Sequence, residues 1–197
     1  MKRSFGPIPS SALHLVVDMQ ELFRSHPDWG TQSLTRIIPA IQRLLSARPE
    51  NAYFSRFIPA QHPDDASGAW QRYYRRWSSV TLDKLDPAQI DVVHELRPWA
   101  KRVADKSGYS AMGNPELRQT ALSSEGRCLV LSGVETDVCV LATALEAVDA
   151  GLRVVLATDA LASSSDACHA KAMDILHDRF DEQVELGTVD QILAAWQ

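Results

Sequence analysis

Three residues of the chain are of the types that a thiol-dependent hydrolysis needs: Asp18, Lys106 and Cys139. A cysteine thiol can attack a carbonyl carbon once a base has accepted its proton. A carboxylate such as Asp18 can be that base, and an ammonium such as Lys106 can offset the negative charge that develops. Each residue alone also has an ordinary structural explanation, as a helix cap, a solvated charge and a small core residue respectively. Only their convergence would indicate an active site.

The elements that would have to position them follow from the hydrophobic pattern. Short apolar runs alternate with segments of helical period, which favours a parallel sheet covered by helices on both faces. No Pro/Gly-rich linker divides the chain, so we expect one three-layer α/β/α domain over residues 1–197. The predicted strands are 12–17, 52–57, 102–105, 128–132, 152–157 and 183–186, and the predicted helices lie near 34–45, 140–150, 166–180 and 189–196.

The candidate residues fall where such a sheet places chemistry, beyond the carboxyl ends of the strands. Asp18 follows the first predicted strand, Lys106 follows the third, and Cys139 lies where the fourth strand turns into a helix. A helix N-terminus favours the thiolate, and its free N–H groups can hold an oxyanion. We expect Asp137, in the same turn, to cap the helix rather than to react.

At these residues the sequence resembles the isochorismatase-like cysteine hydrolase superfamily, over residues 13–186. A single short motif would be weak support, but several motifs in the same order are specific. These are Asp18-Met19-Gln20 after an apolar strand, with Phe23 following; Lys106 before Tyr109-Ser110-Ala111; and Gly133-Val134-Glu135-Thr136-Asp137-Val138-Cys139, with Thr143, Gly151 and Asp159 beyond.

The resemblance implies a six-stranded, mainly parallel sheet and a catalytic triad of Asp18, Lys106 and Cys139. It also implies a cis peptide bond between Val134 and Glu135, which turns the Glu135 N–H toward an oxyanion position shared with the Cys139 N–H. The implied reaction is hydrolysis of a non-peptide C–N bond in a small amide or ureido substrate. The thiolate would attack the carbonyl, and water would hydrolyse the resulting thioester.

Two branches of the superfamily fit this sequence less well. Nicotinamidases carry a metal-binding Asp-x-His after the second strand, whereas this chain has Ser55-Arg56-Phe57 there. His62 follows in a Pro-rich loop, where a lone histidine is typical of a turn, so we expect no metal and no other cofactor. Isochorismatases proper cleave a vinyl ether and lack the nucleophilic cysteine that Cys139 would supply.

Candidate substrate-binding residues lie in and near an aromatic stripe at positions i, i+3, i+4 and i+7, which consists of Trp70, Tyr73, Tyr74 and Trp77. Such a stripe at helical spacing is more often typical of core or subunit-interface packing. The alternative is a lid in which Trp70 or Tyr74 packs on the substrate, with Tyr109 as a further candidate. Arg56 could bind a substrate carboxylate, because a guanidinium fits that group with two hydrogen bonds.

Composition and charge disfavour two classes of partner, and a small-molecule substrate is the partner that we expect. The 197-residue chain has a formal net charge of −5, so we expect neither nucleic acid nor an anionic membrane as a partner. No apolar run resembles a membrane span or a secretory signal, and the three cysteines lack metal or disulfide spacing. We therefore expect a cytoplasmic protein with free thiols. The aromatic stripe and the habits of the superfamily favour a homo-oligomer.

Two alternatives to an amidase stay open. One is a metal-free hydrolase of esters or other acyl compounds, which the same three side chains would serve equally well. The other is a non-catalytic binding protein on the same fold, which would have no reason to retain Asp18, Lys106 and Cys139 together. Within the amidases, the sequence does not choose between carbamoyl, ureido and maleamate substrates.

Overall fold

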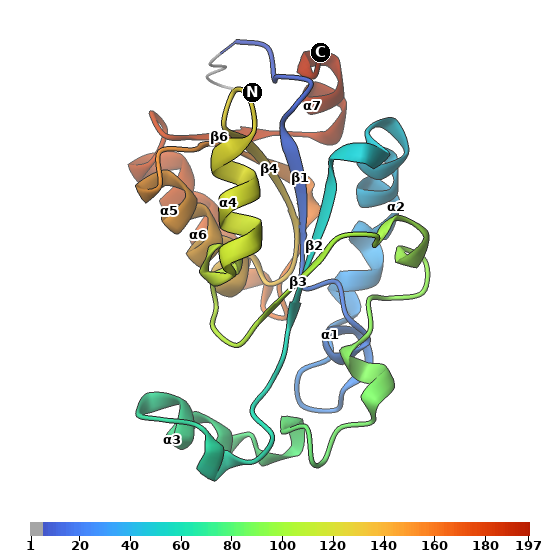
Figure 1. The fold of residues 1–197 in the computed structure, drawn as a ribbon, viewed down its shortest axis with the longest axis vertical. Helices are drawn as coiled ribbons and strands as arrows, with labels where there is room; N and C mark the ends of the chain where they lie inside the picture. The colour runs from blue at the N-terminus through green and yellow to red at the C-terminus, as the bar shows by residue number, and fades with distance from the viewer. Residues whose placement is uncertain (1–5) are drawn as a thin grey trace.

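The computed structural model describes residues 6–197, and the six strands of this part form one sheet (Figure 1). The strand order is β3-β2-β1-β4-β5-β6, and every neighbouring pair is parallel. The predicted parallel α/β fold is confirmed. The strands are β1 (Leu13–Val17), β2 (Ala52–Phe57), β3 (Val103–Lys106), β4 (Cys128–Gly133), β5 (Arg153–Leu161) and β6 (Val184–Gly187).

Helices cover both faces of the sheet. Figure 1 shows α4, α5 and α6 on one side and α1 and α2 on the other. Within residues 6–197 the α-helices are α1 (Glu21–Ser25), α2 (Gln32–Ala47), α3 (Ala69–Arg76), α4 (Pro115–Ser123), α5 (Leu141–Asp149), α6 (Asp166–Arg179) and α7 (Val189–Ala195). In this part of the chain no helix is long and apolar enough to cross a membrane.

The side chains of β1 alternate between two cores because successive residues of a strand point to opposite faces. Leu15 and Val17 pack in the core on the side of α4, α5 and α6, whereas Val16 packs in the core that contains α2 and α7. Burial on both faces explains the continuous apolar runs of the central strands. The helix predicted near residues 34–45 is α2, and it buries its apolar face, as Ile37 and Ile41 illustrate.

Three elements differ from the prediction, and one of them is helix α1, which was not predicted. β5 continues to Leu161 instead of ending at residue 157, because a register shift lets Gly133 of β4 pair with Leu161. Helix α4 was not predicted, although it carries a clear start signal. Asn114 precedes a proline at the first helical position, and its side chain accepts hydrogen bonds from the N–H groups of Glu116 and Leu117.

His14, in the middle of β1, is a fully buried titratable group outside the candidate site. Its Nε2 lies 2.8 Å from Ser132 Oγ, and its Nδ1 has no hydrogen-bond partner within residues 6–197. Burial lowers the pKa of His14 from 6.5 to about 3, because the charged form loses its hydration. The folded protein therefore holds this imidazole neutral.

We expect stability to fall as the pH drops below 6.5, the unperturbed pKa of His14. Between that pH and about 3 the unfolded chain binds a proton at His14 that the folded chain does not bind. The free energy of unfolding then decreases by at most about 1.4 kcal/mol per pH unit. Urea titrations of the wild type and of His14→Gln at about pH 7 and about pH 5 measure this loss. An equal pH dependence in both proteins would contradict the assignment to His14.

Candidate active site

The structure brings Asp18, Lys106 and Cys139 together at the carboxyl ends of β1, β3 and β4, and Lys106 is the last residue of β3. Lys106 Nζ lies 2.7 Å from Asp18 Oδ2 and 3.3 Å from Cys139 Sγ, and all three side chains are buried. The strands that follow β1 in the chain, β2 and β3, extend the sheet on one side, and those that follow β4, β5 and β6, extend it on the other. Parallel sheets bind their ligands at such a switch point, which here lies between β1 and β4. Asp18 and Cys139 follow these two strands.

Asp18 is held in place by the neighbouring strand β2. Ser55 Oγ donates a hydrogen bond to Asp18 Oδ1 at 2.7 Å, and the Asp18 N–H donates to Ser55 O at 3.2 Å. The backbone of Asp18 has a φ of 49°, a left-handed conformation that aspartate tolerates better than most residues. Asp18 Oδ2 contacts Lys106 as an ion pair and accepts no hydrogen bond of regular geometry from the described residues. Ser55 thus fixes one carboxylate oxygen, and the other faces the Lys106 ammonium.

Gly133 joins the turn that carries Cys139 to the strand that carries Asp18. A Cβ atom on Gly133 would lie 2.1 Å from Val17 O, and its φ of +111° is unfavourable for other residues. The next residue, Val134, donates its N–H to the same Val17 oxygen at 3.0 Å. Only glycine allows this close approach of β4 to β1.

The chain between β4 and α5 differs from a regular helix start. The Val134–Glu135 peptide bond is cis, as the resemblance implied. A π-helical turn follows over Thr136–Val140, in which the Val140 N–H donates to Glu135 O at 3.0 Å. The expectation that Asp137 caps the helix is wrong, because its carboxylate makes no capping bond and its buried Oδ1 has no partner among residues 6–197.

Thr143 connects two of the sequence motifs. Its Oγ1 donates to Cys139 O at 2.7 Å and accepts a hydrogen bond from the Ala111 N–H at 2.9 Å. The segment that contains Tyr109 is thereby attached to the turn that carries the thiol. These two hydrogen bonds give a physical reason for a threonine four residues after Cys139.

The sequence favoured a thiolate at Cys139, but the surroundings of this side chain in the structure favour the neutral thiol. Burial and the negative charge of Asp18 raise the pKa of Cys139 well above its usual range, and Lys106 opposes this only in part. Burial alone would lower the pKa of Lys106, but the charge of Asp18 and the hydrogen bonds to Asp18 and Cys139 outweigh burial and raise the pKa. The site at rest is therefore a neutral thiol beside a carboxylate–ammonium pair.

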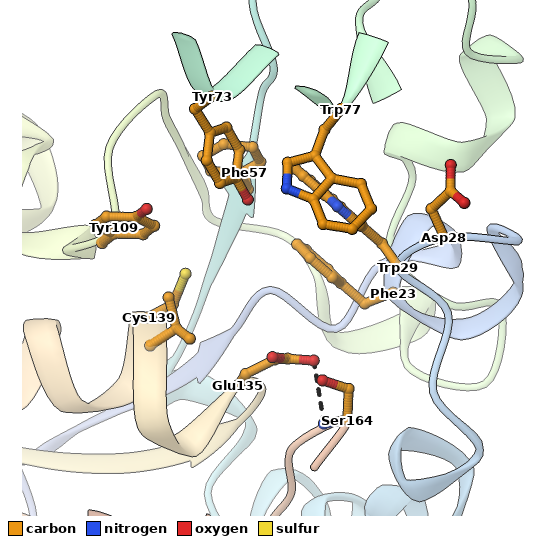
Figure 2. Close-up of a pocket in the computed structure, with 11 residues that line it drawn as sticks. Phe23, Asp28, Trp29, Phe57, Tyr73, Trp77, Tyr109, Glu135, Cys139 and Ser164 are labelled. Carbon is orange, nitrogen blue, oxygen red and sulfur yellow. Dashed lines mark hydrogen bonds between the residues drawn. The ribbon is translucent and has the colours of Figure 1, made fainter. Parts of the chain in front are cut away.

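A cavity of about 270 Å³ opens in front of Cys139 (Figure 2). Figure 2 shows aromatic rings opposite Cys139, with the Glu135 carboxylate on the adjoining wall. Glu135 Oε1 accepts a hydrogen bond from the Ser164 N–H at 3.1 Å. The lining residues are Phe23, Asp28, Trp29, Phe57, Tyr73, Trp77, Tyr109, Glu135, Val138, Cys139 and Ser164.

Of the four candidate substrate-binding residues, Tyr109 lies in the wall of this cavity. The structure does not bring the others to it. The Arg56 guanidinium donates two hydrogen bonds to Asp105, at 2.8 and 2.9 Å, so a neighbouring strand already occupies the face proposed for a carboxylate. Trp70 packs against Tyr109 with ring centroids 4.8 Å apart in a neighbouring groove, and Tyr74 is only 2% exposed beneath Trp70.

The aromatic wall itself was missed by sequence reasoning. Tyr73 and Trp77 belong to the predicted stripe, but its spacing did not show which of its members face the site. Trp29 lies in the loop between α1 and α2, where no periodic pattern marks it. Gln20 was noted only as part of a motif, and its amide holds the wall residue Phe57, accepting from the Phe57 N–H at 2.7 Å and donating to Phe57 O at 3.0 Å.

His62 takes the turn role that was predicted for it. Its Nδ1 accepts a hydrogen bond from the Asp64 N–H at 3.3 Å at the start of a short 3-10 turn. Among the residues that the structure describes, no group of three or more His, Cys, Asp or Glu side chains could hold a metal ion. That the reaction needs no metal stays a prediction.

The sheet order and the buried Asp–Lys–Cys cluster at its switch point define an α/β protein with a candidate thiol site. The chain belongs to the isochorismatase family, whose domain model matches residues 12–187. It is 35% identical over 80 residues to the isochorismatase family protein PncA of Bacillus subtilis (strain 168), a match that covers 41% of this chain and 44% of that protein. The match thus spans less than half the length of that curated relative.

Solved structures share the fold over nearly the whole chain. A cysteine hydrolase from Pseudomonas syringae pv. phaseolicola is 21% identical with a TM-score of 0.78, covering 99% of this chain and 98% of that one. N-carbamoylsarcosine amidase from Thermoplasma acidophilum is 21% identical with a TM-score of 0.69, covering 93% and 97% respectively. At these identities the similarity shows a common fold.

Proposed function

We propose that this protein is a cysteine hydrolase that cleaves the C–N bond of a small amide or ureido compound. The observation that carries the proposal is the position of Lys106 Nζ, 2.7 Å from the Asp18 carboxylate and 3.3 Å from the Cys139 thiol. This cluster adjoins a cavity large enough for a small ligand. Membership of the isochorismatase family and the likeness to proteins named as a cysteine hydrolase and an amidase of an N-carbamoyl compound support it.

In the proposed mechanism, Asp18 accepts the thiol proton while Cys139 Sγ forms a bond to the carbonyl carbon. The backbone N–H groups of Glu135 and Cys139 hold the oxygen that becomes negative. Asp18 then gives the proton to the leaving nitrogen, the C–N bond breaks, and a thioester remains on Cys139. Water activated by Asp18 hydrolyses the thioester, and Lys106 stabilises the negative charge throughout.

The raised pKa of Cys139 affects the order of these events. Because burial and Asp18 keep the thiol neutral at rest, a free thiolate is scarce before the substrate binds. Proton transfer to Asp18 therefore has to accompany the attack on the carbonyl. We expect Oδ2 of Asp18, which is paired with the Lys106 ammonium and accepts no hydrogen bond of regular geometry from the described residues, to accept that proton.

The test is a screen for ammonia release from small amides and ureides, with matched esters in parallel. We expect an amide or ureide to release ammonia and, after acid quenching, the peptide containing Cys139 to carry the acyl group by mass spectrometry. Ammonia release with no acylated Cys139 would contradict the thioester. Hydrolysis of esters alone would favour the acyl-hydrolase alternative, and no turnover of any compound would favour a binding protein.

A further inference from the structure

The walls of the cavity combine aromatic rings with acidic side chains. Six of the eleven lining residues are aromatic, and two more, Asp28 and Glu135, are acidic. Among the described residues that line the cavity, none is lysine or arginine. Lys106 lies close behind Cys139, but its charge is paired with Asp18 at 2.7 Å. The electrostatic balance of the cavity is therefore unfavourable for an anion and favourable for a cation.

The rings are packed against one another and are thus preformed. Around Trp29, the Phe23 ring is stacked at 5.9 Å, Tyr73 is tilted at 5.9 Å, and Trp77 is edge-on at 6.5 Å between centroids. Figure 2 shows these rings around the space that the Glu135 carboxylate also faces. Aromatic faces attract a cation within about 6 Å of the ring centroid, most strongly when the cation has lost its water.

Two of the rings already attract a cation of the protein itself. Lys106 Nζ lies 5.1 Å from the Phe57 centroid, and Arg76 Cζ lies 5.1 Å from the Trp77 centroid. Neither basic residue lines the cavity. Within residues 6–197 no such partner is found for Phe23 or Tyr73, so faces of the aromatic wall are left for a ligand.

Glu135 adds a negative charge without a basic partner. Its Oε1 accepts one hydrogen bond from the Ser164 N–H, and no Lys, Arg or His of residues 6–197 forms an ion pair with it. Burial raises the pKa of Glu135, and the nearby charge of Asp137 adds to the effect. A cation bound in the cavity would supply the missing opposite charge and stabilise the ionised carboxylate.

We infer that the cavity selects substrates with a positively charged group, a quaternary ammonium or a protonated amine, a few bonds from the carbonyl that Cys139 attacks. The charged group would lie between the aromatic wall and Glu135, opposite the thiol. The inference rests on the proposed function for the reaction and adds the class of substrate. It replaces the expectation of a substrate carboxylate bound by Arg56, whose guanidinium is occupied by Asp105.

The direct test compares isosteric amides with the wild-type protein. Betaine amide and 3,3-dimethylbutanamide have the same shape and differ only in the charged nitrogen, and succinamate carries a negative charge instead. We expect kcat/KM to be at least about tenfold higher for betaine amide than for its neutral isostere, equivalent to about 1.4 kcal/mol, with succinamate lowest. Equal values for the two isosteres would overturn the inference and leave an apolar, shape-selective cavity.

A pair of variants assigns the selectivity to the cavity wall. Glu135→Gln keeps the backbone N–H and the size of the side chain, so we expect it to lower the ratio of kcat/KM for betaine amide to kcat/KM for the neutral isostere, whatever its effect on the two values separately. Asp149→Asn, which removes an exposed carboxylate at the far end of α5, is the matched control and is expected to leave the ratio unchanged. An equal loss for both substrates in Glu135→Gln would contradict a role in recognising charge.

Binding without turnover separates this inference from the proposed function. Trp29 and Trp77 line the cavity, so a ligand there is expected to quench tryptophan fluorescence. We expect choline to quench the fluorescence saturably and to bind more tightly than its neutral isostere 3,3-dimethylbutan-1-ol. We expect Trp77→Leu to weaken choline binding more than Trp77→Phe does. Tight choline binding without hydrolysis of any amide would leave the inference standing and refute the proposed hydrolysis of amides. The absence of saturable choline quenching would overturn the inference.

Discussion

Replacing Cys139 with alanine is expected to reduce ammonia release from any amide substrate by about 10,000-fold or more. Alanine offers no atom that can form the thioester, and nucleophiles of this kind typically account for losses of that size. The backbone N–H groups and the aromatic wall remain, so substrate binding is expected to change little. Ammonia release at saturating substrate measures the loss, and far-UV circular dichroism checks that the variant is folded.

The two other cysteines provide matched controls for this substitution. Cys128 begins β4 and is 2% exposed, and burial raises its pKa to about 12. Cys168 is half-buried on α6. Neither lines the cavity, so Cys128→Ala and Cys168→Ala are expected to retain turnover within a few-fold. Turnover by Cys139→Ala close to that of Cys128→Ala would rule out Cys139 as the nucleophile.

The positions of the three candidate residues could be predicted because they depend on local signals. Apolar runs show where strands end, and the topology rule for parallel sheets places those ends along one edge. Asp18 and Cys139 then meet because β1 and β4 are neighbours, with five paired positions between them. Ser55 illustrates a signal that the sequence contained and that was not used, namely a serine within a predicted strand that begins with apolar residues. In the structure Ser55 is 0% exposed.

The cavity wall could not be predicted because it depends on contacts between distant segments. Helical spacing showed that the four aromatic residues of the stripe share a face, but only the position of Trp29 decides which of them face the site. Tyr73 packs on Trp29 and lines the cavity, whereas Tyr74, one residue later, is buried beneath Trp70. The resting state of Cys139 was mispredicted for a similar reason, since burial outweighs a helix N-terminus that is itself replaced by a π-helical turn.

Substitutions of Asp18 and Lys106 are expected to abolish turnover alike while shifting the reactivity of the thiol in opposite directions. Asp18→Asn keeps the shape and a hydrogen-bond acceptor for Ser55, but removes the base and a negative charge that raises the pKa of Cys139. The thiol should then ionise more readily beside Lys106. Lys106→Met removes the positive charge that lowers the pKa of Cys139, so the thiol should ionise less readily. Both variants are expected to lose at least about 1,000-fold in turnover.

Iodoacetamide alkylation of Cys139 across the pH range measures this difference. We expect the alkylation profile of Asp18→Asn to shift to lower pH than that of the wild type, and the profile of Lys106→Met to shift to higher pH. Cys128→Ala/Cys168→Ala is the common background, so that Cys139 is the only thiol observed. Shifts in the same direction would mean that the variants act by loosening the fold. Turnover by Asp18→Asn within tenfold of the wild type would show that another group is the base.

Stability provides an independent measure of the same pair. Each single substitution leaves one buried charge without its partner, since the two side chains are 0% and 2% exposed and 2.7 Å apart. Such a loss destabilises a protein by about 3–5 kcal/mol, whereas replacing both partners by neutral side chains is far less destabilising. The double variant Asp18→Asn/Lys106→Met should therefore be more stable to urea than either single variant, yet remain inactive. If the double variant regains stability but not turnover, the charges of Asp18 and Lys106 are needed for the reaction itself and not only for the stability of the fold.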